Sequence, residues 1–414
     1  MRIAAGSGQV HLTYCLNIHA GETWAEHLQA IRGPACQVRD RLGCREPFGL
    51  GLRLGARAAA ELDHPETLRE AAQCLAAERL YAFTINGFPY GTFHGTRIKE
   101  NVYAPDWTKP ERVAYTLRLA RILAALLPEG VPGSISTVPG TYRAWLQPGD
   151  EGRIVANLMT VVAALARLEK QTGRHLCLAL EPEPDCLWDQ VSQVIAAFTG
   201  DLWRGALPAL ASAVGCRLAQ AETLLRRHLG VCLDTCHQSV LRENPGTALD
   251  DLERHGIAVP KIQVSAAPIF ATSRAGLERA RTFIDPCYLH QSCLTDADGT
   301  HRRFPDLPEA IDAAAALHGP GELRTHFHIP LGVADGPDFR STRADLDASF
   351  WQRVARGVAP HVEVETYTFS VLPPELRSMP VAENIAAELA WVCQAWTEAA
   401  GGATANASHP QAVV

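Results

Sequence analysis

Acidic and histidine side chains follow several apolar runs of this sequence at the point where each run ends. Glu181 closes the run LALE, Asp234 and His237 occur in GVCLDTCHQ, and Glu365 lies near the end of VEVETYTF. Carboxylate oxygens and imidazole nitrogens together form a plausible ligand set for a divalent metal. Two carboxylates beside a metal could also remove and return a proton during a reaction.

Three further residues extend this set. Gln263 lies inside the run KIQVS, and His326 and His328 occur in THFHIP. Aspartate alone suits Mg or Mn, whereas the histidines move the preference toward Mn, Co, Fe or Zn. A single acid at a strand end is usually a loop cap or half of an ion pair. Recurrence of such residues at successive strand ends favours a site instead.

Two positions leave a choice between neighbouring acids. Glu183 could face the same side as Glu181, and only one of the two need be a ligand. Glu363 and Glu365 share this ambiguity, and Glu365 is preferred because it lies nearer the C-terminal end of its run. Cys236, between the aspartate and histidine of DTCH, is interpreted as a packing residue.

The segment 85–107, INGFPYGTFHGTRIKENVYAPDW, combines many aromatic residues with a few polar ones. Aromatic faces with a few convergent polar groups suit sugar-like ligands. His94 is the residue of this segment favoured for substrate contact, and Asn17, at the end of an earlier run, could reach the same place. The alternative is an ordered loop packed on its own aromatic side chains.

Eight apolar runs are predicted to be the strands that position these residues: 10–18, 48–54, 80–86, 133–138, 175–181, 229–234, 261–266 and 361–367. Amphipathic helices are predicted between and after them, over 65–80, 108–127, 151–171, 207–229 and 382–399. This alternation predicts an α/β fold, a closed (β/α)8 TIM barrel whose strands all end at one mouth. The segment 323–331 could be a ninth strand or a loop after the seventh. We expect one barrel domain over 1–400 and a disordered tail over 401–414.

Composition narrows the classes of function. The chain has 414 residues, 47% of them hydrophobic, which is enough for a large core. A net charge of -7 argues against a protein that mainly binds nucleic acid. No signal peptide and no membrane span are evident, and the 12 cysteines contain no CxxC pair. We therefore expect a cytoplasmic protein with reduced cysteines.

With DTCH, LALE, the H-x-H element and Glu365, the chain resembles the xylose isomerase-like TIM-barrel superfamily over about residues 5–398. This group includes sugar isomerases, epimerases and dehydratases, and the endonuclease IV class. More narrowly, HLTYCLNIHAGETW, NGFPYGTFHG, KENVYAPDW, YLHQ and THFHIPL resemble the metabolite traffic protein EboE family. That resemblance implies a bacterial gene cluster that makes or moves a small isoprenoid-linked metabolite, with other proteins of the cluster as partners.

The superfamily resemblance also implies roles for residues. Glu181 and Glu365 become metal-bridging carboxylates and Asp234 a ligand. At the position of His237, epimerase-like relatives contact a substrate oxygen, whereas endonuclease-like relatives bind metal. Strand seven normally offers a histidine, and Gln263 stands there in this chain. Its amide oxygen is a weaker ligand than imidazole, and His326-x-His328, at the place of an endonuclease D-x-H pattern, could compensate for it.

These observations predict metal-assisted isomerisation or epimerisation of a small polyol, sugar, ketose or cyclitol. Glu181, Glu365 and His237 are the expected catalytic residues, and His94, Asn17 and His326 the expected substrate contacts. The metal, with Mn, Zn or Co ahead of Mg, is expected on Glu181, Asp234, Gln263, His328 and Glu365. One alternative is a non-catalytic carrier of a metabolite. A less favoured one is an endonuclease IV-like phosphodiesterase, because the chain is acidic and has no run of Lys or Arg for a DNA groove.

Overall fold

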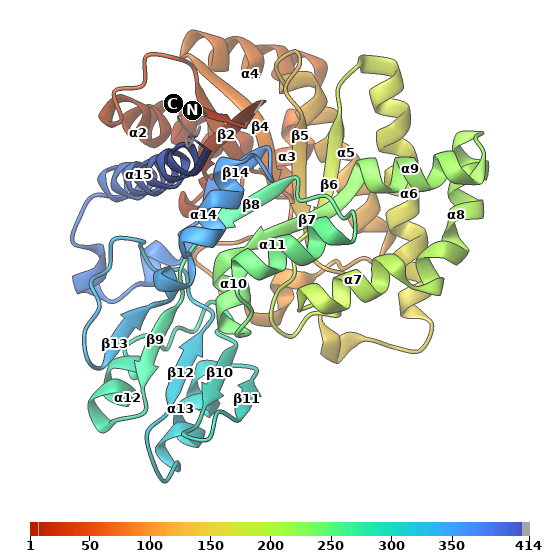
Figure 1. Ribbon diagram of the computed structural model, residues 1–414. Coiled ribbons are helices and arrows are strands. Elements are labelled where there is room, and N and C mark those ends of the chain that lie inside the picture. Colours follow the sequence, from red (N-terminus) through yellow and green to blue (C-terminus); the bar gives the residue numbers. More distant parts are fainter. Residues whose placement is uncertain (7, 408–414) are drawn as a thin grey trace, which may run out of the picture.

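Eight parallel strands form a nearly closed barrel in the computed structural model, which describes residues 1–6 and 8–407 (Figure 1). They are β2 (Gly8–Tyr14), β3 (Phe48–Arg53), β4 (Leu80–Asn86), β5 (Gly133–Thr137), β6 (Leu176–Leu180), β7 (Leu229–Asp234), β8 (Lys261–Val264) and β14 (His361–Val364). A short β1 (Arg2–Ala5) pairs antiparallel with β2. All eight predicted strands are present, so the predicted barrel is confirmed.

The barrel closes between its first two parallel strands. A parallel bridge joins Cys15 to Gly51, and the Thr13 hydroxyl donates a hydrogen bond of 2.6 Å to the carbonyl oxygen of Gly49. The remaining strands follow one another around the barrel in sequence order, with β14 lying between β8 and β2. All the parallel strands therefore end at the same mouth, as this fold requires.

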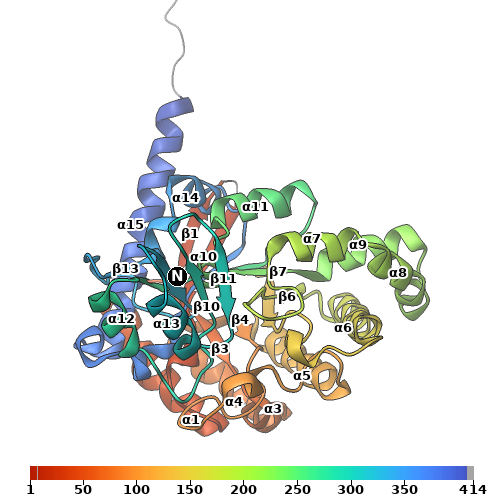
Figure 2. The same cartoon turned by 90° about the horizontal axis from the view of Figure 1, so that it is seen from below.

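Helices surround the barrel and cover its apolar outer face (Figures 1 and 2). They are α1 (Trp24–Ala30), α2 (Cys36–Arg41), α3 (Ala56–Leu62), α4 (Pro65–Ala77), α5 (Pro110–Leu126), α6 (Asp150–Thr172), α7 (Val191–Thr199), α8 (Asp201–Val214), α9 (Leu218–His228), α10 (Thr235–Val240), α11 (Pro245–Arg254), α14 (Ala348–Ala355) and α15 (Val381–Ala407). Within the described residues, none of the helices has the length and apolar character that crossing a membrane requires.

Two helical predictions differ from the structure. The single helix predicted over 207–229 is interrupted at Gly215, which has a φ of +70° and ends α8 before α9 begins. The last helix, α15, continues to Ala407, so the predicted tail 401–414 begins in a helix that projects from the body in Figure 2. Residues 408–414 lie outside the described part of the chain.

A second sheet lies between β8 and β14, in the long connection after the seventh parallel strand. Its antiparallel strands are β9 (Pro268–Ala271), β10 (Ser292–Thr295), β11 (His301–Phe304), β12 (Glu322–Thr325) and β13 (Phe339–Ser341), with α12 (Arg274–Arg281) and α13 (Leu307–Ala315) packed against them. This inserted sheet lies beside the mouth of the barrel, at the bottom of Figure 1. The segment 323–331 is thus a strand of the second sheet that leads into a loop carrying His326 and His328.

The barrel interior is crowded with polar side chains, and glycines in β3 make room for them. Lys261 and Glu363 form an ion pair of 2.5 Å inside the barrel, and both side chains are fully buried. A Cβ atom on Gly51 would lie 1.6 Å from Oε1 of Glu363, and one on Gly49 would lie 2.4 Å from the Phe83 ring. Glycine at these positions is therefore a requirement of packing.

Replacing Gly51 with Ala should destabilise the protein by about 1–3 kcal/mol, because the new methyl group displaces a buried carboxylate from its ion pair. Gly152 provides the matched control. It is exposed in α6, and no atom lies within 4 Å of the point that a methyl group would occupy, so Ala there should stabilise the helix by roughly 1 kcal/mol or less. Urea denaturation of both variants checks the sign of each change. A neutral Gly51→Ala would contradict the packing described for the interior.

Candidate functional site

Three buried carboxylates meet at the mouth of the barrel. Glu181 follows β6, Asp234 ends β7 and Glu365 follows β14, and each side chain is at most 4% exposed. One oxygen from each of the three lies within 4.8 Å of the others. The strand ends named by the sequence therefore converge, because the parallel strands run in register toward the same end.

Two oxygens of this carboxylate cluster have no hydrogen-bond partner within the part of the chain that the structure describes. Oδ1 of Asp234 caps α10, accepting from the amides of Cys236 at 2.8 Å and His237 at 3.2 Å, and it also accepts from the Ser265 hydroxyl at 2.7 Å. Its other oxygen, Oδ2, and Oε2 of Glu181 are buried without any partner. Buried charged oxygens are costly unless a cation or a donor satisfies them.

Glu365, by contrast, is held by three side-chain amides. Asn17 and Asn86 donate to its Oε1 at 2.6 and 2.9 Å, and Gln263 donates through Nε2 to its Oε2. The amide oxygen of Gln263 accepts from the Cys232 thiol at 2.7 Å and so faces away from the carboxylate cluster. In this arrangement Gln263 orients Glu365. The amide oxygen of Gln263, which was expected to bind the metal, does not face the carboxylate cluster.

Burial changes the protonation of these carboxylates. Burial, with the carboxylate of Asp234 adding to it, raises the pKa of Glu365 to about 7. Burial and the neighbouring carboxylates of Glu365 and Asp234 also raise the pKa of Glu181 well above its ordinary range. A divalent cation among the three would offset the repulsion between them. The orphaned oxygens and the charge of the cluster therefore fit a metal ion.

The metal-free protein should lose stability as the pH rises from about 4.5 to about 7. Glu365 has a pKa of about 7 in the folded state against an ordinary value of 4.5, so the folded state holds a proton that the unfolded chain releases. A raised acid pKa makes the free energy of unfolding fall with pH in this window, by at most about 1.4 kcal/mol per pH unit for one proton. Urea denaturation in chelator at several pH values measures the slope. Glu365→Gln should make the slope less steep, because burial also raises the pKa of Glu388 to about 7 and that of Glu183 to about 8, and these groups still contribute. An unchanged slope in that variant would contradict the assignment.

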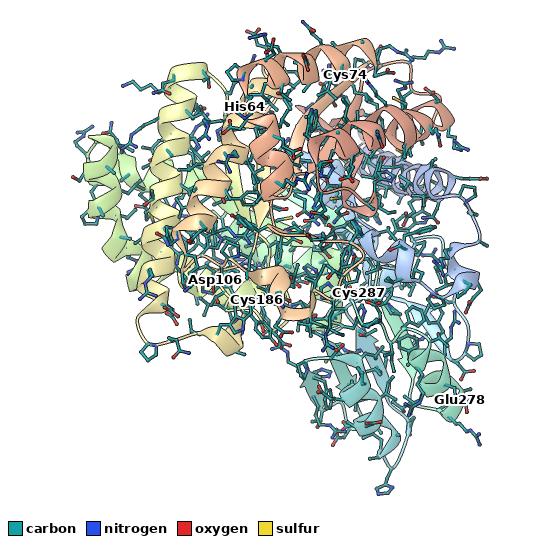
Figure 3. The ribbon with its side chains drawn as sticks, turned by 180° about the vertical axis from the view of Figure 1, so that it is seen from behind. His64, Cys74, Asp106, Cys186, Glu278 and Cys287 are labelled. Carbon is teal, nitrogen blue, oxygen red and sulfur yellow. The ribbon has the colours of Figure 1, made fainter. Side chains whose placement is uncertain are left out.

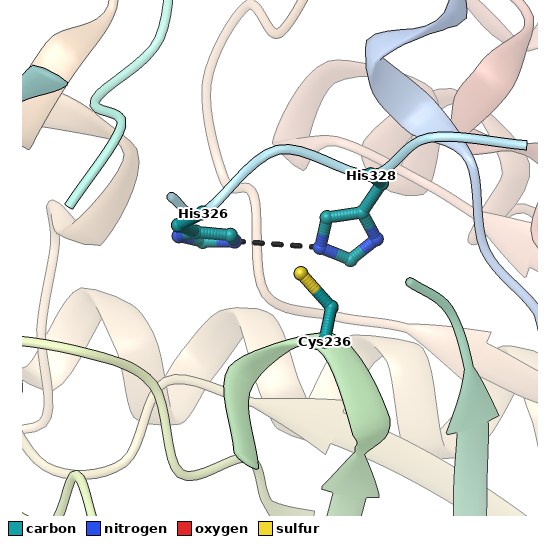
Figure 4. Close-up of side chains that lie close together, drawn as sticks. All are labelled: Cys236, His326 and His328. Atoms are coloured by element: carbon teal, nitrogen blue, oxygen red, sulfur yellow. Dashed lines mark hydrogen bonds between the residues drawn. The ribbon is translucent and has the colours of Figure 1, made fainter. Parts of the chain in front are cut away.

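Three histidines meet beside the carboxylate cluster. Nε2 of His326 lies 3.1 Å from Nε2 of His237 and 3.3 Å from Nε2 of His328. Figure 4 shows His326 and His328 with their rings facing each other above Cys236. His237 comes from α10, whereas His326 and His328 come from the loop after β12. The inserted sheet therefore supplies two of the three rings.

The other nitrogen of each ring is fixed by an acceptor. Nδ1 of His237 faces the carbonyl oxygen of Pro182 at 3.0 Å, and Nδ1 of His328 faces that of Glu365 at 3.1 Å. Nδ1 of His326 faces Oε1 of Gln291 at 2.9 Å. A carbonyl oxygen can only accept, so in each neutral ring the proton sits on Nδ1 and Nε2 carries a lone pair.

Lone pairs that face each other at 3.1–3.3 Å need a proton or a cation between them. Burial lowers the pKa of His237 to about 3 and that of His326 well below its ordinary value, which disfavours the proton. Zn–N bonds of about 2.0–2.1 Å in a tetrahedral site place two ligand nitrogens about 3.3 Å apart. The spacing of each nitrogen pair therefore fits two ligands of one metal ion.

A pocket opens above the carboxylates and histidines. Its aromatic wall consists of Phe88, Phe93, Tyr103, Tyr288 and Tyr367. Its polar lining consists of Asn17, Asn86, Lys99, Glu181, Glu183, His237, His326 and Glu365. Mixed aromatic and polar walls of this kind suit a small hydroxylated ligand.

Glu183 also lines the pocket, where its environment favours the protonated acid. The Tyr103 hydroxyl donates to its Oε1 at 2.8 Å, and burial raises the pKa of Glu183 to about 8 despite this bond. Gln291, directly before β10, donates to the Tyr103 hydroxyl at 2.7 Å and to the carbonyl of Pro184 at 3.0 Å. The side-chain oxygen of Gln291 therefore faces Nδ1 of His326.

His94 does not line the pocket, although substrate contact was expected of it. Its Nε2 lies 2.7 Å from the backbone oxygen of Asn17, and its Nδ1 lies 3.3 Å from the Tyr288 hydroxyl. Both nitrogens therefore have protein partners, and the ring supports Asn17 from behind. Asn86, at the end of β4, follows the same strand-end rule as the predicted residues but was not singled out from the sequence. No comparable sequence pattern predicts the contact of Gln291 with His326.

Comparison with known proteins gives distant structural likeness only. No protein-family model and no curated protein sequence matches the chain. Among solved structures, a xylose isomerase domain protein from Alicyclobacillus acidocaldarius aligns at 11% identity and a TM-score of 0.44, covering 94% of this chain and 99% of its own. The IolI protein with a bound zinc atom aligns at 13%, a TM-score of 0.43, and coverage of 94% and 98%. The 3-keto-D-glucoside 4-epimerase YcjR from E. coli aligns at 12%, a TM-score of 0.43, and coverage of 93% and 99%. The barrel itself is established by the strand order given above.

Proposed function

We propose that this chain is a metal-dependent isomerase or epimerase of the xylose isomerase-like class that acts on a small polyol, ketose or cyclitol. One observation carries the proposal: Glu181 and Glu365, two members of a buried cluster of three carboxylates with orphaned oxygens, line a pocket with aromatic walls. Divalent cations bind such clusters, and hydroxylated rings bind such walls.

The carboxylate cluster would hold the metal through Glu181, Asp234 and Glu365. When bound, a divalent ion supplies Lewis acidity that polarises a substrate carbonyl. Glu181 and Glu365 both line the pocket, so one can take the proton from the carbon beside that carbonyl while the other returns it. Asn17 and Asn86 fix the orientation of Glu365, which keeps its oxygen at a constant place relative to the substrate.

The histidine cluster has a different role in this proposal from the one expected from the sequence. Substrate contact was expected of His237 and His326, and metal binding of His328. Because their Nε2 lone pairs face one another, we assign all three rings to metal binding, with Zn, Mn or Co preferred over Mg. Gln263 is assigned to positioning Glu365, since its amide nitrogen is the atom that faces the carboxylate.

The finer biological role rests on sequence motifs. The segments that resemble the EboE family, such as YLHQ and THFHIPL, support a cytoplasmic role in making or moving a small isoprenoid-linked metabolite. Other proteins of the same gene cluster would then be its partners. In the structure both segments lie at the mouth, where they contribute Tyr288, Gln291 and His326 to the site.

Metal-dependent turnover tests the proposal. The chain is stripped with chelator, reloaded separately with Mn²⁺, Zn²⁺, Co²⁺ or Mg²⁺, and incubated with a panel of ketoses and cyclitol ketones. We expect isomer or epimer formation with the first three ions and little with Mg²⁺. Substrate binding without conversion under every metal would favour the carrier alternative. Cleavage of an abasic DNA duplex would favour the phosphodiesterase.

Replacing Gln291 with Leu should reduce metal affinity or turnover about 10–100-fold. The substitution removes the acceptor that fixes the proton of His326 on Nδ1, and it removes the amide that donates to the Tyr103 hydroxyl. Every proposed metal ligand stays in place. Losses of this size are usual when a partner that orients a metal-binding histidine is removed. Calorimetric metal titration measures the effect. Gln291→Glu keeps an acceptor at this position and should retain more affinity than Leu, and equal losses in both variants would contradict the orienting role.

A further inference from the structure

A second group of possible metal ligands lies at the opposite end of the barrel from the mouth. Glu169 is near the end of α6, His175 directly precedes β6, and His228 ends α9 directly before β7. One ligand atom from each lies within 4.8 Å of the others. This N-terminal-end cluster is separate from the site described above, because Glu181 and Asp234 lie at the other ends of the same two strands.

His228 is fixed in one tautomer with a free nitrogen. Its side chain is fully buried, and its Nδ1 lies 2.8 Å from the carbonyl oxygen of Leu176, which can only accept. Nε2 of the neutral ring therefore carries a lone pair. That nitrogen has no hydrogen-bond partner in residues 1–6 and 8–407 and faces Oε2 of Glu169 at 3.3 Å. A lone pair and a carboxylate oxygen repel each other at this distance unless a proton or a cation lies between them.

His175 faces the other carboxylate oxygen. Its Nδ1, buried and without a hydrogen-bond partner among the described residues, lies 3.6 Å from Oε1 of Glu169. Ligand atoms of a tetrahedral zinc ion are about 3.3 Å apart for bonds of 2.0–2.1 Å. The two nitrogen–oxygen distances are close to this value. Burial lowers the pKa of both rings, which disfavours the protonated alternative.

Arg227 also binds this carboxylate. It donates through Nε to Oε2 at 2.9 Å and through a terminal nitrogen to Oε1. Each carboxylate oxygen can accept more than one bond, so the imidazole-facing lone pairs remain available. The guanidinium charge must nevertheless weaken the attraction of Glu169 for a cation.

We infer that Glu169, His175 and His228 form a structural site for a zinc-like divalent cation. Two imidazoles and one carboxylate favour Zn²⁺ or Co²⁺ over Mg²⁺ or Ca²⁺. The side chains of Glu169 and His175 are 23% and 28% exposed, so solvent has access and water can complete the coordination. A bound ion would tie the end of α6 to the starts of β6 and β7, the two strands that carry Glu181 and Asp234 to the mouth.

The test is calorimetric titration of the full, chelator-stripped chain with Zn²⁺. We expect His175→Ala and Glu169→Gln each to bind one equivalent fewer than the wild type. His64→Ala provides the matched control, because His64 is an exposed surface histidine labelled in Figure 3, and it should bind as the wild type does. Glu181→Gln should affect only the ions at the mouth, which separates this inference from the proposed function.

Arg227→Gln distinguishes the metal site from a plain ion pair. Removing the guanidinium charge should tighten Zn²⁺ binding at this cluster at least about tenfold, because a unit charge a few ångströms away no longer repels the ion. Circular dichroism confirms that each variant is folded. Unchanged Zn²⁺ stoichiometry in folded His175→Ala and Glu169→Gln would overturn the inference. Unchanged or weaker binding in folded Arg227→Gln would overturn it as well.

Discussion

Glu181→Gln should lower metal affinity at the mouth and turnover by about 10³-fold or more. The substitution keeps the shape of the side chain but removes one of the three carboxylates proposed to hold the metal, whose oxygens lie within 4.8 Å of one another. It also removes one of the two carboxylates proposed to transfer the proton, and general acid–base catalysis alone contributes about 10²–10⁴-fold. Unlike Asp234, Glu181 caps no helix, so the loss should not arise from local unfolding. Metal titration and turnover of the reloaded variant measure the two effects.

Glu388→Gln is the matched control for this substitution. Glu388 is also a buried glutamate with a pKa raised to about 7 by burial, but it accepts from the amide of Leu331 and the side chains of Thr366 and Asn384, outside the cluster. Its replacement should lower stability while metal stoichiometry is retained. If Glu181→Gln binds metal as tightly as the wild type, Glu181 is not a ligand.

Lys261→Met should destabilise the fold by about 3–5 kcal/mol. Lys261 and Glu363 are fully buried inside the barrel, and their charged atoms lie 2.5 Å apart. Removing one member leaves an uncompensated buried charge, and the cost of that charge exceeds the contribution of the pair itself. Chemical denaturation of the metal-free protein gives the change in the free energy of unfolding.

The double variant Lys261→Met with Glu363→Met isolates the cause. It removes both charges while retaining most of the volume, so much of the lost stability should return. If the double variant is as unstable as the single one, the loss comes from packing and not from the unpaired carboxylate.

The barrel strands could be predicted from the sequence because each is a short apolar run that is buried on both faces. Parallel strands covered by helices need no alternation of polar and apolar residues. Short, almost wholly apolar runs such as LCLAL and LGVCLD are typical of such strands. The inserted sheet lacks this signal. Its strands have three or four residues, and β11, HRRF, is exposed at its first three positions, so it resembles a loop.

The carboxylates of the site follow from the strand-end rule, whereas their partners do not. Alternation along β14 and the residue after it places both Glu363 and Glu365 inside the barrel. Glu363 lies deeper and pairs with Lys261, whereas Glu365 lies at the mouth. Gln263 was placed correctly on its strand, but the direction of its amide depends on Cys232 and Glu365, which no local pattern reports. The meeting of His326 and His328 with His237 depends on how the inserted sheet docks beside the mouth.

Hydrogen exchange at the substrate carbon tests the central claim most directly. The metal-loaded chain is incubated in D₂O with the ketose and cyclitol-ketone panel, and deuterium incorporation beside the carbonyl is followed by NMR, so that exchange is seen even where no new isomer accumulates. We expect metal-dependent incorporation into at least one of these compounds, lost with chelator and in Glu181→Gln and Glu365→Gln. Binding of a panel compound to the metal-loaded protein without any exchange, or exchange that persists in both glutamine variants, would contradict the account.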